Sequence, residues 1–207
     1  MKNMLKDAAV LFVITLVAGL ALGFVYQITK EPIALAEEKA AKEAYAEVFP
    51  AASDFEEAEL VIPEDESWQS AWLESGFENV ELVNILHALG EDGSLLGYVF
   101  TVTSHEGYGG DITFTMGISS DGTLNGISIL SISETAGLGM KAESVLKPQF
   151  AGKKVPSFTY TKQGAVSDSQ IDAISGATIT TRALTNAVNG GLYYFQTQLG
   201  GGSYEAE

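Results

Sequence analysis

The chain has 207 residues, 46% of them apolar, and its 27 acidic and 11 basic residues give a net charge of −16. This length is enough for one membrane anchor and one domain of ordinary size. The acidic balance argues against nucleic-acid partners and anionic lipid surfaces, which both require a basic face.

Cysteine is absent, which excludes a disulfide framework, a thiolate zinc site and an ordinary iron–sulfur cluster. Any redox chemistry would therefore require an organic cofactor. The two histidines, His87 and His105, have no partner at metal-ligand spacing, and we expect no metal site.

Residues 8–28, AAVLFVITLVAGLALGFVYQI, contain no charged side chain. As a helix they extend about 30 Å, the thickness of the hydrocarbon core of a bilayer. The apolar part of a cleaved signal peptide is shorter, about 7–15 residues, so we expect a retained transmembrane helix. Gly19 and Gly23 form a GxxxG pair, which fits both the usual glycine content of membrane helices and close packing against another membrane protein.

Lysines flank this segment on both sides, so their count does not determine its orientation. Long domains translocate regardless of such counts. We therefore expect a single-pass protein of the cell (inner) membrane, with its N-terminus inside and its domain on the extracytoplasmic side.

Residues 33–49 are rich in alanine, glutamate and lysine, and predict a helix that leaves the membrane and ends at Pro50. The next residues, 51–80, are acidic and loop-like, with Trp68 and Trp72 at i, i+4 spacing on a short helix against the core. Strand-like segments separated by glycine-containing turns then cover residues 83–89, 95–104, 112–119 and 124–133. Because short connections imply antiparallel pairing, the predicted fold class is α+β: a transmembrane helix followed by a twisted antiparallel sheet packed with helices.

The last predicted element is a helix that starts between Thr178 and Thr181, runs to residue 199 and carries one apolar stripe. Gly190 and Gly191 lie within it, and we expect them to mark a close approach to the sheet. The predicted organisation is an anchor over residues 1–30, a helical and acidic connecting region over 31–80, a main domain over 81–199 and a disordered tail over 200–207.

Residues 172–181, DAISGATITT, place four hydroxyl side chains around a Gly-Ala pair at the start of that helix. One explanation is capping, in which a threonine accepts a backbone N–H bond and the glycine permits a tight turn. The other is anion binding, because helix N-termini hold phosphates, and a threonine there could carry a phosphate ester. The segment is not a P-loop, since no lysine follows at GxxxxGK spacing.

Residues 172–178, DAISGAT, resemble the flavinylation motif Dxx(S/T)GAT. Residues 134–143, ETAGLGMKAE, resemble the ETPGLG-x-K loop of the same family, with Ala136 in place of the usual proline. Residues 107–130 resemble its sheet-forming core, and the anchor followed by TKEPIALAEEKA also matches. The chain is thus similar to the G subunit of the Rnf ion-translocating electron-transport complex, a family related to the C subunit of the sodium-pumping NADH:quinone oxidoreductase.

The resemblance implies an FMN-binding domain in which Thr178 receives FMN through a phosphoester bond from a flavin transferase. It places the ETAGLG loop against the isoalloxazine ring. Tyr108 would stack on the ring or pack on the sheet, and Lys162 would stabilise the reduced flavin or simply be exposed. Asp172 would bind a metal during transfer or hold the turn. The implied cofactor-binding residues are Tyr108, Glu134, Thr135, Leu138, Lys162, Ser175, Gly176, Ala177, Thr178 and Thr180.

The function implied by the resemblance is electron relay within an Rnf-type complex, which transfers electrons between ferredoxin and NAD and couples this to Na⁺ or H⁺ export. The chain would act as an electron-transfer subunit without independent catalysis, and other membrane subunits would be its partners. Two alternatives remain at this point: a free-standing carrier of covalent FMN that serves extracellular acceptors, and a non-redox anchored binding domain.

Overall fold

The computed structural model describes residues 2–200 of the chain. It consists of two compact units that meet between Ala41 and Lys42, and each unit is described by itself. The predicted tail falls almost entirely on residues 201–207, which lie outside the described residues. The predicted domain limits at residues 30 and 80 stay predictions.

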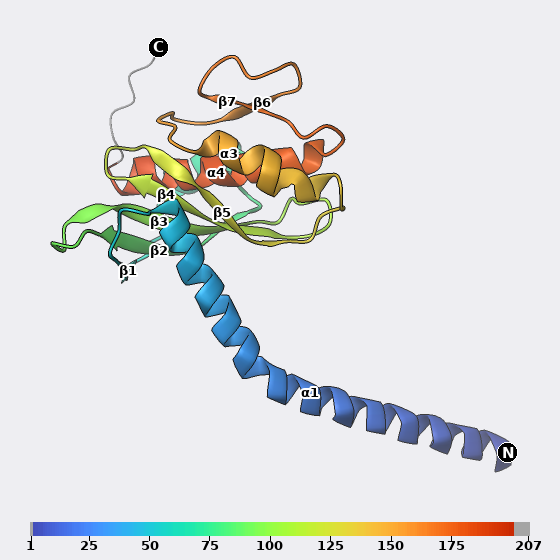
Figure 1. Cartoon of the computed structure of the whole chain (residues 1–207). Helices are drawn as coiled ribbons and strands as arrows, with labels where there is room; N and C mark the ends of the chain where they lie inside the picture. The colour runs from blue at the N-terminus through green and yellow to red at the C-terminus, as the bar shows by residue number, and fades with distance from the viewer. Residues whose placement is uncertain (1, 201–207) are drawn as a thin grey trace. The chain divides into compact units, whose positions relative to one another are not determined.

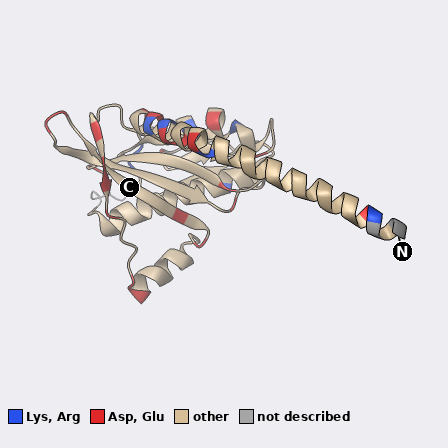
Figure 2. Ribbon diagram, turned by 90° about the horizontal axis from the view of Figure 1, so that it is seen from below, with Lys and Arg blue, Asp and Glu red and all other residues tan. Residues whose placement is uncertain are grey.

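The first unit is formed by most of helix α1, which spans Lys2–Val48 and contains Pro32. The anchor and the helix after Pro32 are therefore one continuous helix, because a proline removes a single hydrogen bond and the residues around it are strong helix formers. By length and composition, α1 is able to cross a membrane. Its large apolar side chains between Val10 and Ile28 are exposed, and Figure 2 shows a long uncharged stretch that follows the charges near its start.

The second unit is built on a five-stranded antiparallel sheet in the order β1-β2-β3-β4-β5. The strands span Asp54–Ala58, Val80–Leu89, Leu95–Ser104, Ile112–Ser119 and Leu124–Ile132. The four predicted strands are confirmed. The expectation that residues 51–80 are only loop and a short helix was wrong, because β1 pairs with β2 there; its sequence DFEEA has no apolar alternation to reveal it.

Helices cover one face of this sheet, as Figure 1 shows for α4 and α3. Helix α4 spans Thr178–Gln198, and its buried residues include Leu184, Val188 and Leu192. A Cβ atom built on Gly191 would lie 2.4 Å from the Met116 Sδ on β4, so the predicted close approach of this helix to the sheet is confirmed. The glycine allows the helix backbone to lie close against the strand.

Short elements connect the sheet to α4. Between β5 and α4 come a 3₁₀ turn η1 (Gly139–Lys141), a π-helical turn η2 (Ala142–Leu146) and α3 (Lys147–Phe150). Two three-residue strands, β6 (Thr159–Thr161) and β7 (Gln170–Asp172), form a separate parallel pair. Helix α2, Glu66–Glu74, carries the two tryptophans as predicted, with ring centroids 5.1 Å apart.

The opposite face of the sheet is covered where α1 ends. Val48 and Phe49 form a second buried cluster with Leu86, Ala88 and Val99. Glu47, one residue earlier, accepts a hydrogen bond from the Ser128 Oγ of β5 at 2.5 Å and pairs with Lys147 at 2.8 Å. The last turn of α1 is thereby part of the folded domain.

Candidate functional site

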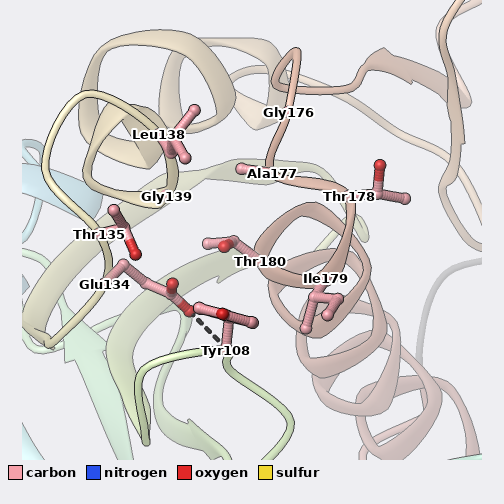
Figure 3. Close-up of a pocket in the computed structure, with 10 residues that line it drawn as sticks. All are labelled: Tyr108, Glu134, Thr135, Leu138, Gly139, Gly176, Ala177, Thr178, Ile179 and Thr180. Atoms are coloured by element: carbon pink, nitrogen blue, oxygen red, sulfur yellow. Dashed lines mark hydrogen bonds between the residues drawn. The ribbon is translucent and has the colours of Figure 1, made fainter.

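A cavity of about 500 Å³ lies where three segments far apart in the sequence meet. They are the β3–β4 loop, the segment after β5 and the start of α4 (Figure 3). The volume lies in the usual range of small-molecule sites. The lining residues are Tyr108, Glu134, Thr135, Leu138, Gly139, Gly176, Ala177, Thr178, Ile179 and Thr180.

The β3–β4 loop is fixed against the end of β5 by close backbone contact. The Tyr108 backbone N–H donates to the Glu134 Oε1 at 2.7 Å. A Cβ atom on Gly109 would lie 2.0 Å from the Ser133 carbonyl oxygen, so only glycine allows the loop this close. The Tyr108 side chain itself is 70% exposed and lies at the edge of the cavity, not packed on the sheet.

The segment after β5 turns sharply at Gly137, whose φ of 79° favours glycine. The Leu138 N–H donates to the Thr135 carbonyl at 3.1 Å and closes this turn. Gly139 is buried, and a Cβ atom there would lie 2.7 Å from both the Glu134 Cβ and the Thr180 Oγ1. Loop and helix therefore meet at van der Waals distance across Gly139.

The start of α4 does not follow the capping alternative. The N-cap is Ala177, and among residues 2–200 no side chain accepts a hydrogen bond from the first-turn N–H groups. The Thr181 Oγ1 accepts from the Ile174 N–H at 3.1 Å and donates to the Ala177 carbonyl at 2.9 Å, so this threonine closes the preceding turn instead. The N–H groups of residues 178–180 are left to an external acceptor.

The two threonines of the first turn lie in different surroundings. Thr180 is 1% exposed, and its hydroxyl has no hydrogen-bond partner among residues 2–200. Figure 3 shows it pointing into the cavity toward Glu134 and Thr135. Thr178 is half-buried at the cavity edge, and its side chain points away from that pair.

The structure brings eight of the ten predicted cofactor residues together and leaves two outside the cavity lining. Ser175 is exposed in the turn before α4, and Lys162 is exposed in the loop after β6. Gly139 and Ile179 line the cavity without having been selected. Both lie inside or beside the two quoted motifs, and only the tertiary structure shows that the Gly139 backbone and the Ile179 side chain face the cavity.

Asp172 supports the turn rather than the cavity. Its Oδ1 accepts from the Ala165 N–H at 2.7 Å, and Gln149 bonds both its backbone N–H and its carbonyl. These contacts favour the turn-holding alternative. Within the part of the chain that the structure describes, no group of three His, Cys, Asp or Glu side chains is arranged to hold a metal ion.

His105 lies at the base of the loop that carries Tyr108. Its Nδ1 lies 3.0 Å from the Asp111 Oδ1 and its Nε2 lies 3.2 Å from the Glu81 Oε2. The hydrogen bond with Asp111 is the largest influence on the pKa of His105 and raises it, while burial opposes this. His105 therefore joins β2 to both ends of the β3–β4 loop.

Two family models match the chain: the FMN-binding domain over residues 107–193 and the RnfG N-terminal region over residues 1–48. The G subunit of the Na⁺-translocating ferredoxin:NAD⁺ oxidoreductase complex of Acetobacterium woodii is 33% identical over 94% of this chain and 93% of its own length. The G subunit of the ion-translocating oxidoreductase complex of Methanosarcina acetivorans is 30% identical over 96% and 98% of the two chains.

Among solved structures, the crystal structure of NqrC from Shewanella oneidensis matches with a TM-score of 0.50. The two chains are 15% identical, and the match covers 77% of this chain and 95% of that one. At this identity the likeness concerns the fold alone.

Proposed function

Because the chain belongs to the family of G subunits of Rnf ion-translocating oxidoreductase complexes, we propose that it carries FMN attached covalently to Thr178 and relays electrons within such a complex. The observation that carries the proposal is the position of Thr178. It lies at the edge of the cavity, at a helix N-terminus whose N–H groups are not capped by any side chain in the described part of the chain.

The residues present fit this cofactor. The uncapped first turn of α4 supplies N–H donors and a positive dipole end for a phosphate. Thr180, a buried residue, offers a hydroxyl that lacks a partner among the described residues and is suited to a ribityl oxygen. Leu138 and Tyr108 offer apolar and aromatic surface for a flat ring.

Attachment requires a flavin whose phosphate already carries a leaving group, such as a flavin dinucleotide presented by a transferase. The Thr178 Oγ forms a bond to that phosphorus, the anhydride P–O bond breaks, the nucleoside monophosphate leaves, and the hydroxyl proton passes to a base of the transferase. Thr178 is half-buried and therefore reachable in the folded domain.

Bound FMN supplies reversible acceptance and release of one or two electrons. The chain's own residues hold it. Glu134 fixes the Tyr108 backbone, Gly139 lets loop and helix approach, and Thr180 presents its hydroxyl to the cavity. A covalent bond makes retention independent of the free flavin concentration, which matters for a domain outside the cytoplasm.

Helix α1 is proposed as a single-pass anchor in the cell membrane, with the domain on the extracytoplasmic side and the other membrane subunits as partners. Gly19 and Gly23 have nothing within 4 Å of an added Cβ atom, so this face of α1 is open to a neighbouring helix. Relatives are named as both Na⁺- and proton-translocating complexes, so the proposal names only the class of coupled ion transport.

The proposal is tested by producing the chain together with a flavin transferase. Intact-mass spectrometry of the wild type should show one added flavin nucleotide, and a denaturing gel under ultraviolet light should show a fluorescent band. Thr178→Val should abolish both signals, while Thr135→Val, a matched change at the same cavity, should retain them. Fluorescence that survives Thr178→Val would defeat the assignment of the site.

Membership of a complex needs a separate measurement. In mild detergent the chain from its native host should co-purify with polytopic subunits. Isolation of the flavin-loaded chain alone would favour the free-standing carrier instead.

A further inference from the structure

The chain contains a single arginine, Arg182, and it lies on α4 four residues after Thr178. Side chains at i and i+4 are neighbours on a helix surface. Long side chains also lean toward the helix N-terminus, over the preceding turn. Helix geometry thus puts the Thr178 position within reach of the Arg182 guanidinium, and the side chain is exposed.

We infer that Arg182 is a positioning residue that binds the phosphate group of the flavin attached to Thr178. This inference rests on the proposed function, since it concerns the same site. It names a residue that no sequence motif selected and that does not line the cavity.

The direction of the side chains separates the phosphate from the ring. Successive helical residues are rotated by about 100°, so Thr178 and Thr180 point to opposite sides of the first turn, about 200° apart. Thr180 faces the cavity. Arg182 is rotated by only about 40° from Thr178 and therefore reaches the attachment side, not the ring side.

Two observations indicate a ligand at this helix start. Thr180 is 1% exposed, and its hydroxyl points into the cavity and has no partner among residues 2–200. Arg182 has no ion pair within the same described residues, in contrast to Lys147 and Lys153, which are both paired with carboxylates.

A carboxylate that could compete for Arg182 is held elsewhere. Asn186 lies on α4 one turn after Arg182, and its Nδ2 donates to the Oε2 of Glu106 at 3.3 Å. Asn186 also donates to the Gly76 carbonyl at 2.7 Å, which fixes the amide. Glu106 is thus engaged one turn beyond Arg182, and the guanidinium remains available for an anion.

A phosphodiester on Thr178 retains one negative charge, and a guanidinium binds such a group through two parallel N–H bonds. The first-turn N–H groups of α4 add donors on the other side of the phosphate. Arg182 and these N–H groups would together fix the orientation of the phosphodiester that links the flavin to Thr178. The cavity residues would then contact the flavin ring.

The test compares loaded wild type, Arg182→Lys, Arg182→Gln and Lys154→Gln, the last removing an equal charge from an exposed side chain outside the cavity. Arg182→Gln should shift the ³¹P resonance of the attached phosphate and lower the fluorescence anisotropy of the flavin, with Arg182→Lys in between. Lys154→Gln should match the wild type. A wild-type resonance and anisotropy in Arg182→Gln would overturn the inference, as would an equal shift in Lys154→Gln.

A second measurement does not require that the flavin be attached to the protein. The flavin-free protein is titrated with inorganic phosphate, and the backbone amide resonances of residues 178–180 are followed by NMR. We expect binding at millimolar phosphate in the wild type and about fivefold weaker binding in Arg182→Gln, the scale of an exposed charge-assisted bond. Equal affinity in both, or no binding in the wild type, would overturn the inference. Failure of the proposed function would instead appear as a wild-type mass without flavin.

Discussion

Gly139 determines how closely the loop after β5 approaches the start of α4. Its added Cβ would lie 2.7 Å from the Thr180 Oγ1 and from the Glu134 Cβ, which is closer than real Cβ contacts. The glycine is required by neighbours on both sides and not by its own backbone angles, since its φ is not positive. The cavity keeps its shape because residue 139 carries no side chain.

Gly139→Ala should therefore damage the cavity more than the fold. The added methyl must push the loop away from α4, at an overpacking cost of about 1–3 kcal/mol. We expect a lower Tm by calorimetry and a tethered flavin with lower fluorescence anisotropy. Gly23→Ala, where an added Cβ has nothing within 4 Å, is the control and should leave both values unchanged.

His105 should give the domain a small pH dependence of stability. Its pKa is raised in the folded state, mainly because of its hydrogen bond to Asp111, with Glu81 facing it from β2. The stabilisation is therefore fully present below the unfolded pKa of about 6.5 and is lost as the pH rises through the raised folded pKa. Because the side chain is 42% exposed, we expect less than about 1 kcal/mol.

The measurement is the Tm of the wild type and of His105→Gln at about pH 6 and pH 8, on either side of the histidine titration. The difference between the two proteins should favour the wild type at the lower pH and shrink at the higher one. A difference that is independent of pH would show that the ion pairs contribute nothing.

At the scale of elements, the last turn of α1 is attached to the sheet through a glycine on β4. A Cβ on Gly117 would lie 2.4 Å from the Val48 carbonyl oxygen. Since this contact is with backbone, no side-chain rotation relieves it.

Gly117→Ala should detach the Val48–Phe49 cluster from the sheet and lower the Tm, by about the same overpacking cost. Hydrogen exchange should become faster in residues 42–49 and remain slow in α4. Equal protection of residues 42–49 in both proteins would contradict this attachment.

Local patterns were sufficient for the main strands and the last helix. Alternation and turn signals located β3 and β4 at their observed limits, and β2 began three residues before the predicted start. β1 escaped prediction because its acidic sequence is stabilised by its partner strand. The three-residue strands β6 and β7 pair through contacts across the fold that no local pattern records.

The cavity was not predictable from periodicity. Its three segments were selected by resemblance, and only tertiary structure shows that they meet. The same limit left the capping explanation open beside anion binding: four hydroxyls stood near the helix start, and Thr181, the last of them, bonds backward to close the turn. A hydroxyl-rich segment favours a helix N-cap, but the sequence alone does not determine which hydroxyl accepts a hydrogen bond from which backbone N–H.

At the scale of the whole molecule, the chain joins an exposed apolar helix to an acidic domain and contains no cysteine. The absence of cysteine makes its topology directly testable. Val166, in the loop after β6, is 88% exposed and is a suitable site for a single introduced thiol.

Val166→Cys in intact cells stripped of any outer barrier should react with a membrane-impermeant maleimide, because the domain is expected outside. Lys6→Cys, before the apolar segment, should react only after permeabilisation. The reverse pattern would place the domain in the cytoplasm, and reaction of both would mean that α1 does not span the membrane.

The accessibility of Thr178 has a consequence for how the protein matures. A modifying enzyme can reach this hydroxyl after the polypeptide has adopted its final conformation, and the neighbouring Thr180 is by then already enclosed. Under the proposed attachment at Thr178, insertion of the flavin would follow folding, and bare and loaded forms of the same polypeptide would coexist. The amount of polypeptide in a membrane preparation would then report its synthesis, and only the flavin-to-polypeptide ratio would report the loaded fraction.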